Sequence, residues 1–174
     1  MITLRLPGES PRVLAEAARA LMNAAPEVPL LVSGRVDVAL AVGAAGVHLG
    51  PEDLPAAIVR RFAPEGLVIG ASAGGTSEVL RAAGADFVAI GPVFPVTGTA
   101  GASLEGAMGS DGFSALAKEC GLPAVAIGGV SPANARMLMT AGAAGVAVIS
   151  ALFGAADPMG AARALRSSLD ASER

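Results

Sequence analysis

Short apolar runs alternate along the whole chain with longer stretches whose apolar residues recur at helical spacing. The short runs are apolar throughout, which is typical of parallel strands buried on both faces. Strands are therefore predicted at Ile2–Leu6, Pro29–Val32, Gly46–Leu49, Leu67–Gly70, Phe87–Ile90, Ala124–Ile127 and Gly145–Ile149. Strands that alternate with helices in this manner predict an α/β fold built on a parallel sheet.

Capping residues mark where the intervening helices begin. A helix over Pro11–Asn23 starts at Ser10-Pro11, where an N-cap residue precedes a proline at the first helical position. The same signature recurs at Ser131-Pro132 and Asp157-Pro158. Further caps are predicted at Asp53 before Leu54–Phe62, at Thr76 before Ser77–Ala83, and at Ser110 or Asp111 before Gly112–Glu119.

An internal repeat supports this reading of the pattern. The segments 43–50, 84–91 and 142–149 resemble one another, and in each a helix ends at glycine before a tight turn and a buried strand. Such repeated βα units predict a (β/α)₈ TIM-barrel type of fold, in one domain over residues 1–174, with its active site at the carboxyl ends of the strands. Only seven strands are found, so we expect a barrel truncated to seven βα units. Either the missing unit is absent in biology, or the start codon is misplaced.

Composition then excludes several classes of function. Hydrophobic residues make up 53% of the chain, yet no apolar run approaches the roughly 18 residues of a membrane span, so no membrane partner is expected. The net charge is −3 and basic residues are scattered singly, which argues against nucleic acid. A single cysteine and a single histidine make an internal disulfide impossible and a structural zinc site improbable. With no signal peptide recognised, a cytoplasmic protein with a small-molecule ligand is expected.

The sharpest local signal is a strand that runs into Gly128-Gly129 and then into a capped helix. Glycines let the backbone approach an anion closely and point its N–H groups at it. After the next strand, Ile149 and Ser150 lead into a short helical turn over Ser150–Phe153, whose free N–H groups favour a dianion. These two loops predict a phosphate site made of Gly128, Gly129, Ile149 and Ser150. The alternative is that the glycine pair is merely a tight turn.

Several motifs together resemble the thiamine-phosphate synthase and TenI family. They are Arg35–Leu40, Gly46–Gly50, Glu52-Asp53-Leu54, Gly91–Pro95 and Ala126–Gly129. The resemblance covers nearly the whole chain and implies a (β/α)₈ barrel acting in thiamine biosynthesis. In that family, the synthase branch joins a hydroxymethylpyrimidine diphosphate to a thiazole phosphate with magnesium, and the TenI branch isomerises the thiazole phosphate. Ile2–Leu6 corresponds to the family's second strand, so the resemblance implies that the first βα unit has no counterpart in this sequence. Arg5 is kept, and Pro7 stands where the synthase has lysine.

Departures from the family pattern bear on the metal and on the branch. The synthase has an Asn-Asp pair whose aspartate binds magnesium, and this chain has Ser33-Gly34 there, with the glycine that TenI-like proteins carry. Asp53 matches the other magnesium carboxylate, but its position favours the role of a helix N-cap over that of a metal ligand. One carboxylate holds a diphosphate-bound magnesium less well than two, so Mg²⁺ is only a weak expectation.

The loop after Phe94-Pro95 is a second departure. The synthase has hydroxyl residues and a lysine there, and this chain keeps the hydroxyls as Thr97 and Thr99 without a cation. Both threonines are retained as candidate phosphate ligands, although a missing cation weakens the stabilisation of a leaving diphosphate. Against the TenI branch, Gly74 occupies the place of its acid–base histidine.

Candidate catalytic residues are fewer, and no catalytic group is assigned. Arg5 and Ser72 are the candidates: Ser72 matches a substrate-contacting serine of the family, with a strand-end cap as the equal alternative. His48 lies in a strand, where a lone histidine is more often a hydrogen-bonded core residue than a catalyst. Cys120 at a helix end has no nearby histidine in sequence to activate it.

Two functions remain open at this stage. The chain is either an enzyme of thiazole phosphate chemistry, by TenI-like isomerisation or weak coupling, or a degenerate barrel that binds a thiazole or thiamine phosphate for regulation. A seven-stranded sheet also leaves an open edge, because strand number, tilt and stagger are linked in a closed barrel. We expect a second copy of the chain to cover that edge in a homodimer, with self-closure of the seven strands as the alternative.

Overall fold

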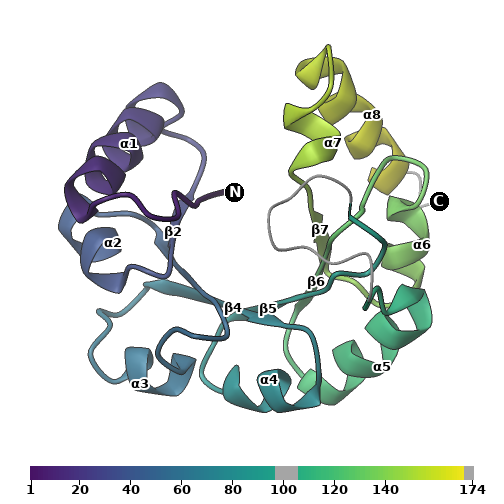
Figure 1. The fold of residues 1–174 in the computed structure, drawn as a ribbon, viewed down its shortest axis with the longest axis horizontal. Coiled ribbons are helices and arrows are strands. Elements are labelled where there is room, and N and C mark those ends of the chain that lie inside the picture. Colours follow the sequence, from purple (N-terminus) through teal and green to yellow (C-terminus); the bar gives the residue numbers. More distant parts are fainter. Residues whose placement is uncertain (97–105, 171–174) are drawn as a thin grey trace. The chain divides into compact units, whose positions relative to one another are not determined.

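A computed structural model describes residues 1–96 and 106–170 of the chain (Figure 1). The fold is of the (β/α) TIM-barrel type with seven parallel strands in chain order, as the sequence pattern predicts. Strands and helices alternate as follows: β1 (Ile2–Leu4), α1 (Pro11–Ala24), β2 (Leu30–Ser33), α2 (Val36–Val42), β3 (Gly46–Leu49), α3 (Ala56–Arg60), β4 (Val68–Ala73), α4 (Thr76–Arg81), β5 (Phe87–Ile90), α5 (Gly109–Cys120), β6 (Ala124–Ile127), α6 (Ala135–Thr140), β7 (Gly145–Ala147), α7 (Ser150–Phe153) and α8 (Pro158–Asp170). None of the helices in the described ranges is long and apolar enough to cross a membrane.

The chain divides into two compact units. The first comprises Met1–Ser72 with Leu80–Phe87, and the second comprises Ala73–Val79 with Val88–Arg174. In the first unit β1, β2, β3 and β4 pair in parallel, and in the second β5, β6 and β7 do so. Helices α1, α2 and α3 lie together along the strands of the first unit in Figure 1, and α1 packs against α2.

The strand register of the first unit separates two faces of its sheet. Paired positions on neighbouring strands share a face, and on one of the two faces these positions are aliphatic and buried. Its members are Leu30, Val32, Val47, Leu49, Ile69 and Ala71. The opposite face carries Thr3, Leu31, Ser33, Gly46, His48 and Gly70, and Ser72 follows Gly70 by two residues on the same side. Polar residues of β2, β3 and β4 are thus gathered on one face.

Two of the predicted helix caps are confirmed. The Val13 N–H donates to Ser10 Oγ over 3.3 Å, and Pro11 is the first residue of α1. The Gly160 N–H donates to Asp157 Oδ1 over 2.9 Å at the start of α8. The predicted short helical turn over Ser150–Phe153 is also present, as α7.

The other predicted caps are wrong, for local reasons. Helix α3 begins at Ala56 with Pro55 at its N-cap, because the Asp53 carboxylate turns back to accept the Gly50 N–H. Helix α6 begins at Ala135, because Asn134 Oδ1 accepts the Ser131 N–H and closes a turn before the helix.

Two further helix starts differ from the prediction. Helix α5 begins at Gly109 after Met108, so neither Ser110 nor Asp111 is its N-cap. Thr76 lies inside α4, where its hydroxyl donates to Glu119 Oε2 over 3.1 Å instead of capping the helix. In both places a contact within the second unit accompanies the different start: the Gly109 N–H donates to the Val93 carbonyl over 2.9 Å, and Thr76 bonds to Glu119.

Strand boundaries shift by a few residues. Strand β1 ends at Leu4 and β7 at Ala147, each two residues earlier than predicted, whereas β4 extends to Ala73. The extension of β4 matters for the site, because it places Ser72 inside a strand and not in the loop after it. The predicted helix end at Gly43 is confirmed: Gly43 ends α2 in the left-handed conformation, whereas the start of this helix after Arg35 was not predicted.

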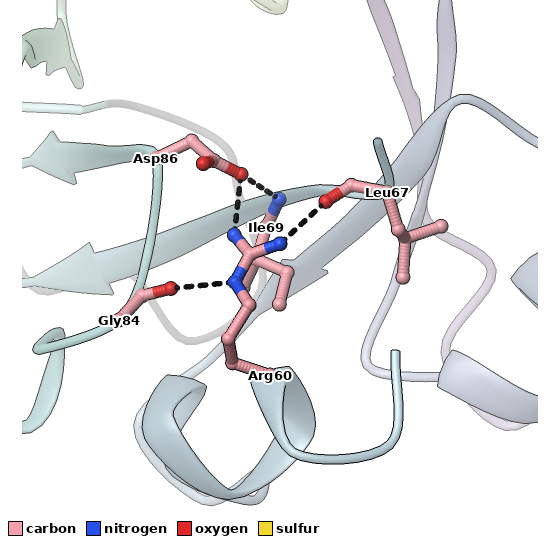
Figure 2. Close-up of polar contacts among 5 residues, drawn as sticks. All are labelled: Arg60, Leu67, Ile69, Gly84 and Asp86. Carbon is pink, nitrogen blue, oxygen red and sulfur yellow. Dashed lines mark hydrogen bonds and ion pairs between the residues drawn. The ribbon is translucent and has the colours of Figure 1, made fainter. Parts of the chain in front are cut away.

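An arginine network joins three segments of the first unit (Figure 2). From the end of α3, Arg60 Nη1 donates to the Leu67 carbonyl at 2.9 Å, Nε to the Gly84 carbonyl at 3.2 Å, and Nη2 to Asp86 Oδ2 at 2.7 Å. The same Asp86 oxygen accepts the Ile69 N–H at 2.7 Å. The network therefore ties the entry of β4 and the turn before β5 to a helix, at the amino ends of the strands, where barrel residues serve stability.

We predict that Arg60→Met lowers the free energy of unfolding by about 1–2 kcal/mol, because it removes three hydrogen bonds but keeps the side chain's apolar stem. Urea denaturation measures the change. Arg12→Ala is the matched control: the Arg12–Glu16 pair spans 3.9 Å and both side chains are largely exposed, so we expect a change within about 0.5 kcal/mol. Equal effects of the two substitutions would contradict a structural role for the network.

Candidate functional site

Polar groups of the first unit meet on the face shared by Ser33, His48 and Ser72. His48 pairs in register with Ser33 of β2 and with Gly70 of β4, and Ser72 lies one pleat beyond Gly70. The imidazole Nε2 of His48 lies 2.8 Å from Ser72 Oγ, within hydrogen-bonding distance. The serine hydroxyl is therefore engaged by a neighbouring strand, and the expectation that it caps the following loop has no support in this contact.

Gly70 provides the space in which the His48 ring lies. A Cβ added at Gly70 would lie 2.4 Å from Phe87 Cζ and 2.7 Å from His48 Nδ1, so any larger residue would displace one of the two rings. The rings of His48 and Phe87 have centroids 5.8 Å apart and are tilted by 35°. Packing thus holds the imidazole in one position against β4.

Burial lowers the pKa of His48 from its usual value, and the charge of Asp53 opposes this effect only in part. Burial disfavours the imidazolium because the charged form loses its hydration. The ring is therefore neutral at pH 7, and its Nε2 either donates to the serine oxygen or accepts the serine proton. The sequence-based interpretation of His48 as a hydrogen-bonded histidine agrees with this environment.

Asp53 lies at the carboxyl end of β3, in the turn that follows the strand. Its Oδ2 accepts the Gly50 N–H at 2.7 Å. A Cβ added at Gly34 would lie 3.2 Å from both carboxylate oxygens, so the two positions face each other across the ends of β2 and β3. Gly34 has φ +71°, a conformation that aspartate and asparagine tolerate better than most side chains.

A magnesium site is incomplete among the described residues. No group of three or more His, Cys, Asp or Glu side chains that could hold a metal lies within residues 1–96 and 106–170. Asp53 supplies one carboxylate, and Gly34 leaves open the place of a second. Such a site fits a magnesium ion only if the substrate's own phosphates provide most of the ligands.

The Arg35-Val36-Asp37 motif has a local structural role. Arg35 forms a bidentate pair with Asp37, with Nε to Oδ1 at 2.9 Å and Nη2 to Oδ2 at 2.6 Å. Hydrogen bonding to Arg35 lowers the pKa of Asp37, which lies in the first turn of α2. A carboxylate there is favoured by the helix dipole. Arg5, the other basic candidate, is exposed just beyond β1.

In the second unit, the two predicted phosphate loops follow paired strands, β6 and β7. Gly128 and Gly129 both have positive φ, 94° and 64°, and they pack closely against the segment after β5. A Cβ at Gly128 would lie 2.6 Å from Pro92 Cα, and one at Gly129 would lie 2.7 Å from Phe94 Cβ. The tight-turn interpretation of the glycine pair therefore has its own structural basis.

The anion-binding interpretation of the two loops stays a prediction. The Gly128 carbonyl accepts the Phe94 N–H at 3.0 Å, and the Gly129 carbonyl accepts Asn134 Nδ2 at 3.0 Å. These bonds engage carbonyl oxygens, whereas a phosphate needs the N–H groups. Ser150 is exposed at the first position of α7, and Ile149 beside it is 63% exposed.

Four other residues named in the sequence analysis are Thr97, Thr99, Gly74 and Cys120. Thr97 and Thr99 lie outside the described residues. Gly74 donates its N–H to Glu78 Oε2 and so belongs to the start of α4. The Cys120 thiol lies 3.5 Å from the Ala117 carbonyl and 3.3 Å from the Leu122 carbonyl, so its hydrogen-bonding capacity is used at the end of α5.

Sequence reasoning missed the pairing of His48 with Ser72. The two residues are 24 positions apart, and each was judged separately. The signal that could have joined them is the period of two in the strands: histidine at the third position of β3 and serine two residues after Gly70 lie on one face if β3 and β4 are in register.

The depressed pKa of His48 predicts a pH dependence of stability. The unfolded chain has the usual histidine pKa of 6.5 and binds a proton at a higher pH than the folded protein does. Stability therefore falls as the pH drops from 6.5 toward the folded pKa, and is unaffected by this group above 6.5. We expect His48→Gln to flatten this part of the stability profile in urea denaturation at pH 5 to 7. An unchanged profile in the variant would contradict the prediction.

Comparison with known proteins places this geometry in a family. The sequence model of thiamine monophosphate synthase matches residues 1–152. Thiamine-phosphate synthase of Chloroflexus aurantiacus is 48% identical over 141 residues, covering 80% of this chain and 64% of that protein. Thiamine-phosphate synthase of Azorhizobium caulinodans is 43% identical over 178 residues, covering 100% of this chain and 83% of that protein. The solved thiamine phosphate pyrophosphorylase from Pyrococcus furiosus superposes with a TM-score of 0.87 at 37% identity, covering 99% of this chain and 84% of that one.

These relatives also bear on the branch of the family. Gly34 points to the TenI branch, but the relatives carry the names of synthases, and Gly74 stands where the TenI branch has its histidine. The synthase branch is therefore favoured over the TenI branch. Three features agree with this assignment: the repeated βα units, the polar residues at the ends of β2 to β4, and the loops at Gly128-Gly129 and Ser150. The chain belongs to the thiamine monophosphate synthase family of thiamine biosynthesis.

Proposed function

We propose that this protein couples a hydroxymethylpyrimidine diphosphate to a thiazole phosphate, releasing diphosphate and forming thiamine phosphate. The observation that carries the proposal is the family match over residues 1–152. Within this range Asp53 and Gly128-Gly129 lie at strand ends, and Ser72 lies on the polar face of the sheet. Strand ends are where barrel enzymes bind their substrates. The chain spans less than two thirds of one synthase relative, so its own activity needs a direct test.

The second unit supports binding of the thiazole phosphate. Gly128-Gly129 follow β6 and Ser150 follows β7, and these strands are hydrogen-bonded neighbours. The N–H groups at Gly129 and Ser150, together with the serine hydroxyl, offer donors to a phosphate without a lysine. Gly128 and Gly129 are half-buried.

The first unit supports binding of the diphosphate. When magnesium is bound, it neutralises charge on the departing diphosphate. Asp53 is the one described carboxylate that faces position 34, and it would hold the ion together with the substrate's own oxygens. Because Gly34 removes the second carboxylate, we infer that coupling is slow, below about 1 s⁻¹.

Gly34→Asp tests this assignment directly. The new carboxylate would project toward Asp53, whose oxygens lie 3.2 Å from the position of the added Cβ. We predict that coupling, measured by the appearance of thiamine phosphate, rises about tenfold or more and saturates at lower Mg²⁺ than for the unmodified protein. Melting temperature should also become more dependent on Mg²⁺, because two facing carboxylates repel each other unless a cation lies between them.

Gly34→Asn is the matched control, since it has the same shape and tolerance of positive φ but no charge. It should leave the magnesium dependence unchanged. Thiazole phosphate binding without turnover, in the unmodified protein and in Gly34→Asp alike, would favour a binding protein over an enzyme. Absence of both binding and turnover would overturn the proposal.

We also propose that two copies of the chain associate. The support is the N-terminal strand β1, beside which Met1, Ile2 and Leu6 are 64%, 37% and 36% exposed. Exposed strand edges and apolar side chains favour pairing with another chain. Light scattering at micromolar concentration should report twice the mass of one chain, and Ile2→Lys should reduce it. A monomeric mass at all concentrations would refute the association.

A further inference from the structure

The contact between His48 and Ser72 joins a half-buried ring to a half-buried hydroxyl on the polar face of the first unit. Nε2 of the ring and Oγ of the serine are 2.8 Å apart, on the neighbouring strands β3 and β4. We propose that His48 is a positioning residue that orients the Ser72 hydroxyl toward the substrate. This inference rests on the proposed coupling function and on the substrate contact of Ser72 that the resemblance to the family implies.

The geometry of the ring leaves it little freedom. His48 lies opposite Gly70 in the register of β3 and β4, and its Nδ1 would be 2.7 Å from a Cβ at that glycine. The Phe87 ring bounds the same space. A side chain held by packing is suited to holding another group, because it pays no further entropy when it forms the hydrogen bond.

A serine hydroxyl by itself has three rotamers and a freely rotating proton. The contact with Nε2 selects one rotamer and uses one of the hydroxyl's hydrogen-bonding valences. The remaining valences are left for a substrate, and Ser72 is half-buried rather than enclosed. Either tautomer of the neutral ring has this effect, since Nε2 can donate to Oγ or accept its proton.

A purely structural histidine would behave differently. If the contact served only to satisfy two polar groups beneath the surface, its loss would lower stability and leave turnover of the folded protein unchanged. If His48 positions Ser72, its loss should lower kcat, and that effect should disappear once the hydroxyl is gone.

The experiment is a double-mutant cycle. His48→Phe keeps a ring of similar outline without a hydrogen-bonding atom, Ser72→Ala removes the hydroxyl, and the double variant combines them. Coupling of hydroxymethylpyrimidine diphosphate to thiazole phosphate is followed at saturating substrates. We expect each single substitution to lower kcat about tenfold, and the double variant to be no slower than Ser72→Ala.

His48→Gln serves as the rescue variant, because its amide group reaches the position of Nε2 and can bond to the serine. It should recover most of kcat, and this recovery would test the positioning role of His48 even if His48→Phe folds poorly. Additive effects in the cycle, or a normal kcat in His48→Phe with only stability reduced, would overturn the proposal.

A second readout separates this inference from the proposed function. His48 is the only histidine of the chain, so its ring nitrogens give a single pair of ¹⁵N resonances. Adding thiazole phosphate or, separately, hydroxymethylpyrimidine diphosphate should shift the Nε2 resonance in the unmodified protein and not in Ser72→Ala. If the protein shows no coupling, the proposed function fails while this shift still tests the contact. If coupling is normal and no shift occurs with either compound, the positioning role fails and the function stands.

Discussion

Parallel pairing of the strands is the constraint on which the rest of this structure depends. Because every strand runs the same way, the carboxyl ends of the paired strands lie at the same edge in each unit, and the loops that follow them become neighbours. The register then decides which side chains meet. Residues far apart in the chain, such as Ser33, His48 and Gly70, stand side by side only because β2, β3 and β4 are aligned at these positions.

The two ends of the strands in the first unit serve different needs. At the amino ends, Arg60 bonds to two carbonyls and to Asp86, which in turn accepts a backbone N–H of β4, so the charged groups are used to join segments. Toward the carboxyl ends, Asp53 faces Gly34 and His48 lies beside Gly70, two positions without side chains. That division lets the chemistry of one end vary while the other maintains the fold.

Small residues are as important to the site as polar ones. Gly70 makes room for two rings, and without it the imidazole could not lie beside β4 and reach Ser72. Gly34 has the opposite consequence, because it leaves the Asp53 carboxylate facing an open position where a second carboxylate would complete a cation site. The same residue type thus enables one contact and removes another, and the difference lies in what faces it.

The sequence by itself determined the fold class, the position of the strands to within a few residues, and the caps Ser10 and Asp157, because these depend on local periodicity and on contacts three residues apart. The resemblance of its motifs also indicated the family. The caps at Asp53 and Ser131 were wrong because a competing turn bond formed nearby, to Gly50 in one place and from Asn134 in the other. Only the tertiary structure decided the partners of Arg60, the space at Gly70 and the contact of His48 with Ser72. Each of these depends on strand register or on packing between segments that are separated in the sequence, which no local pattern encodes.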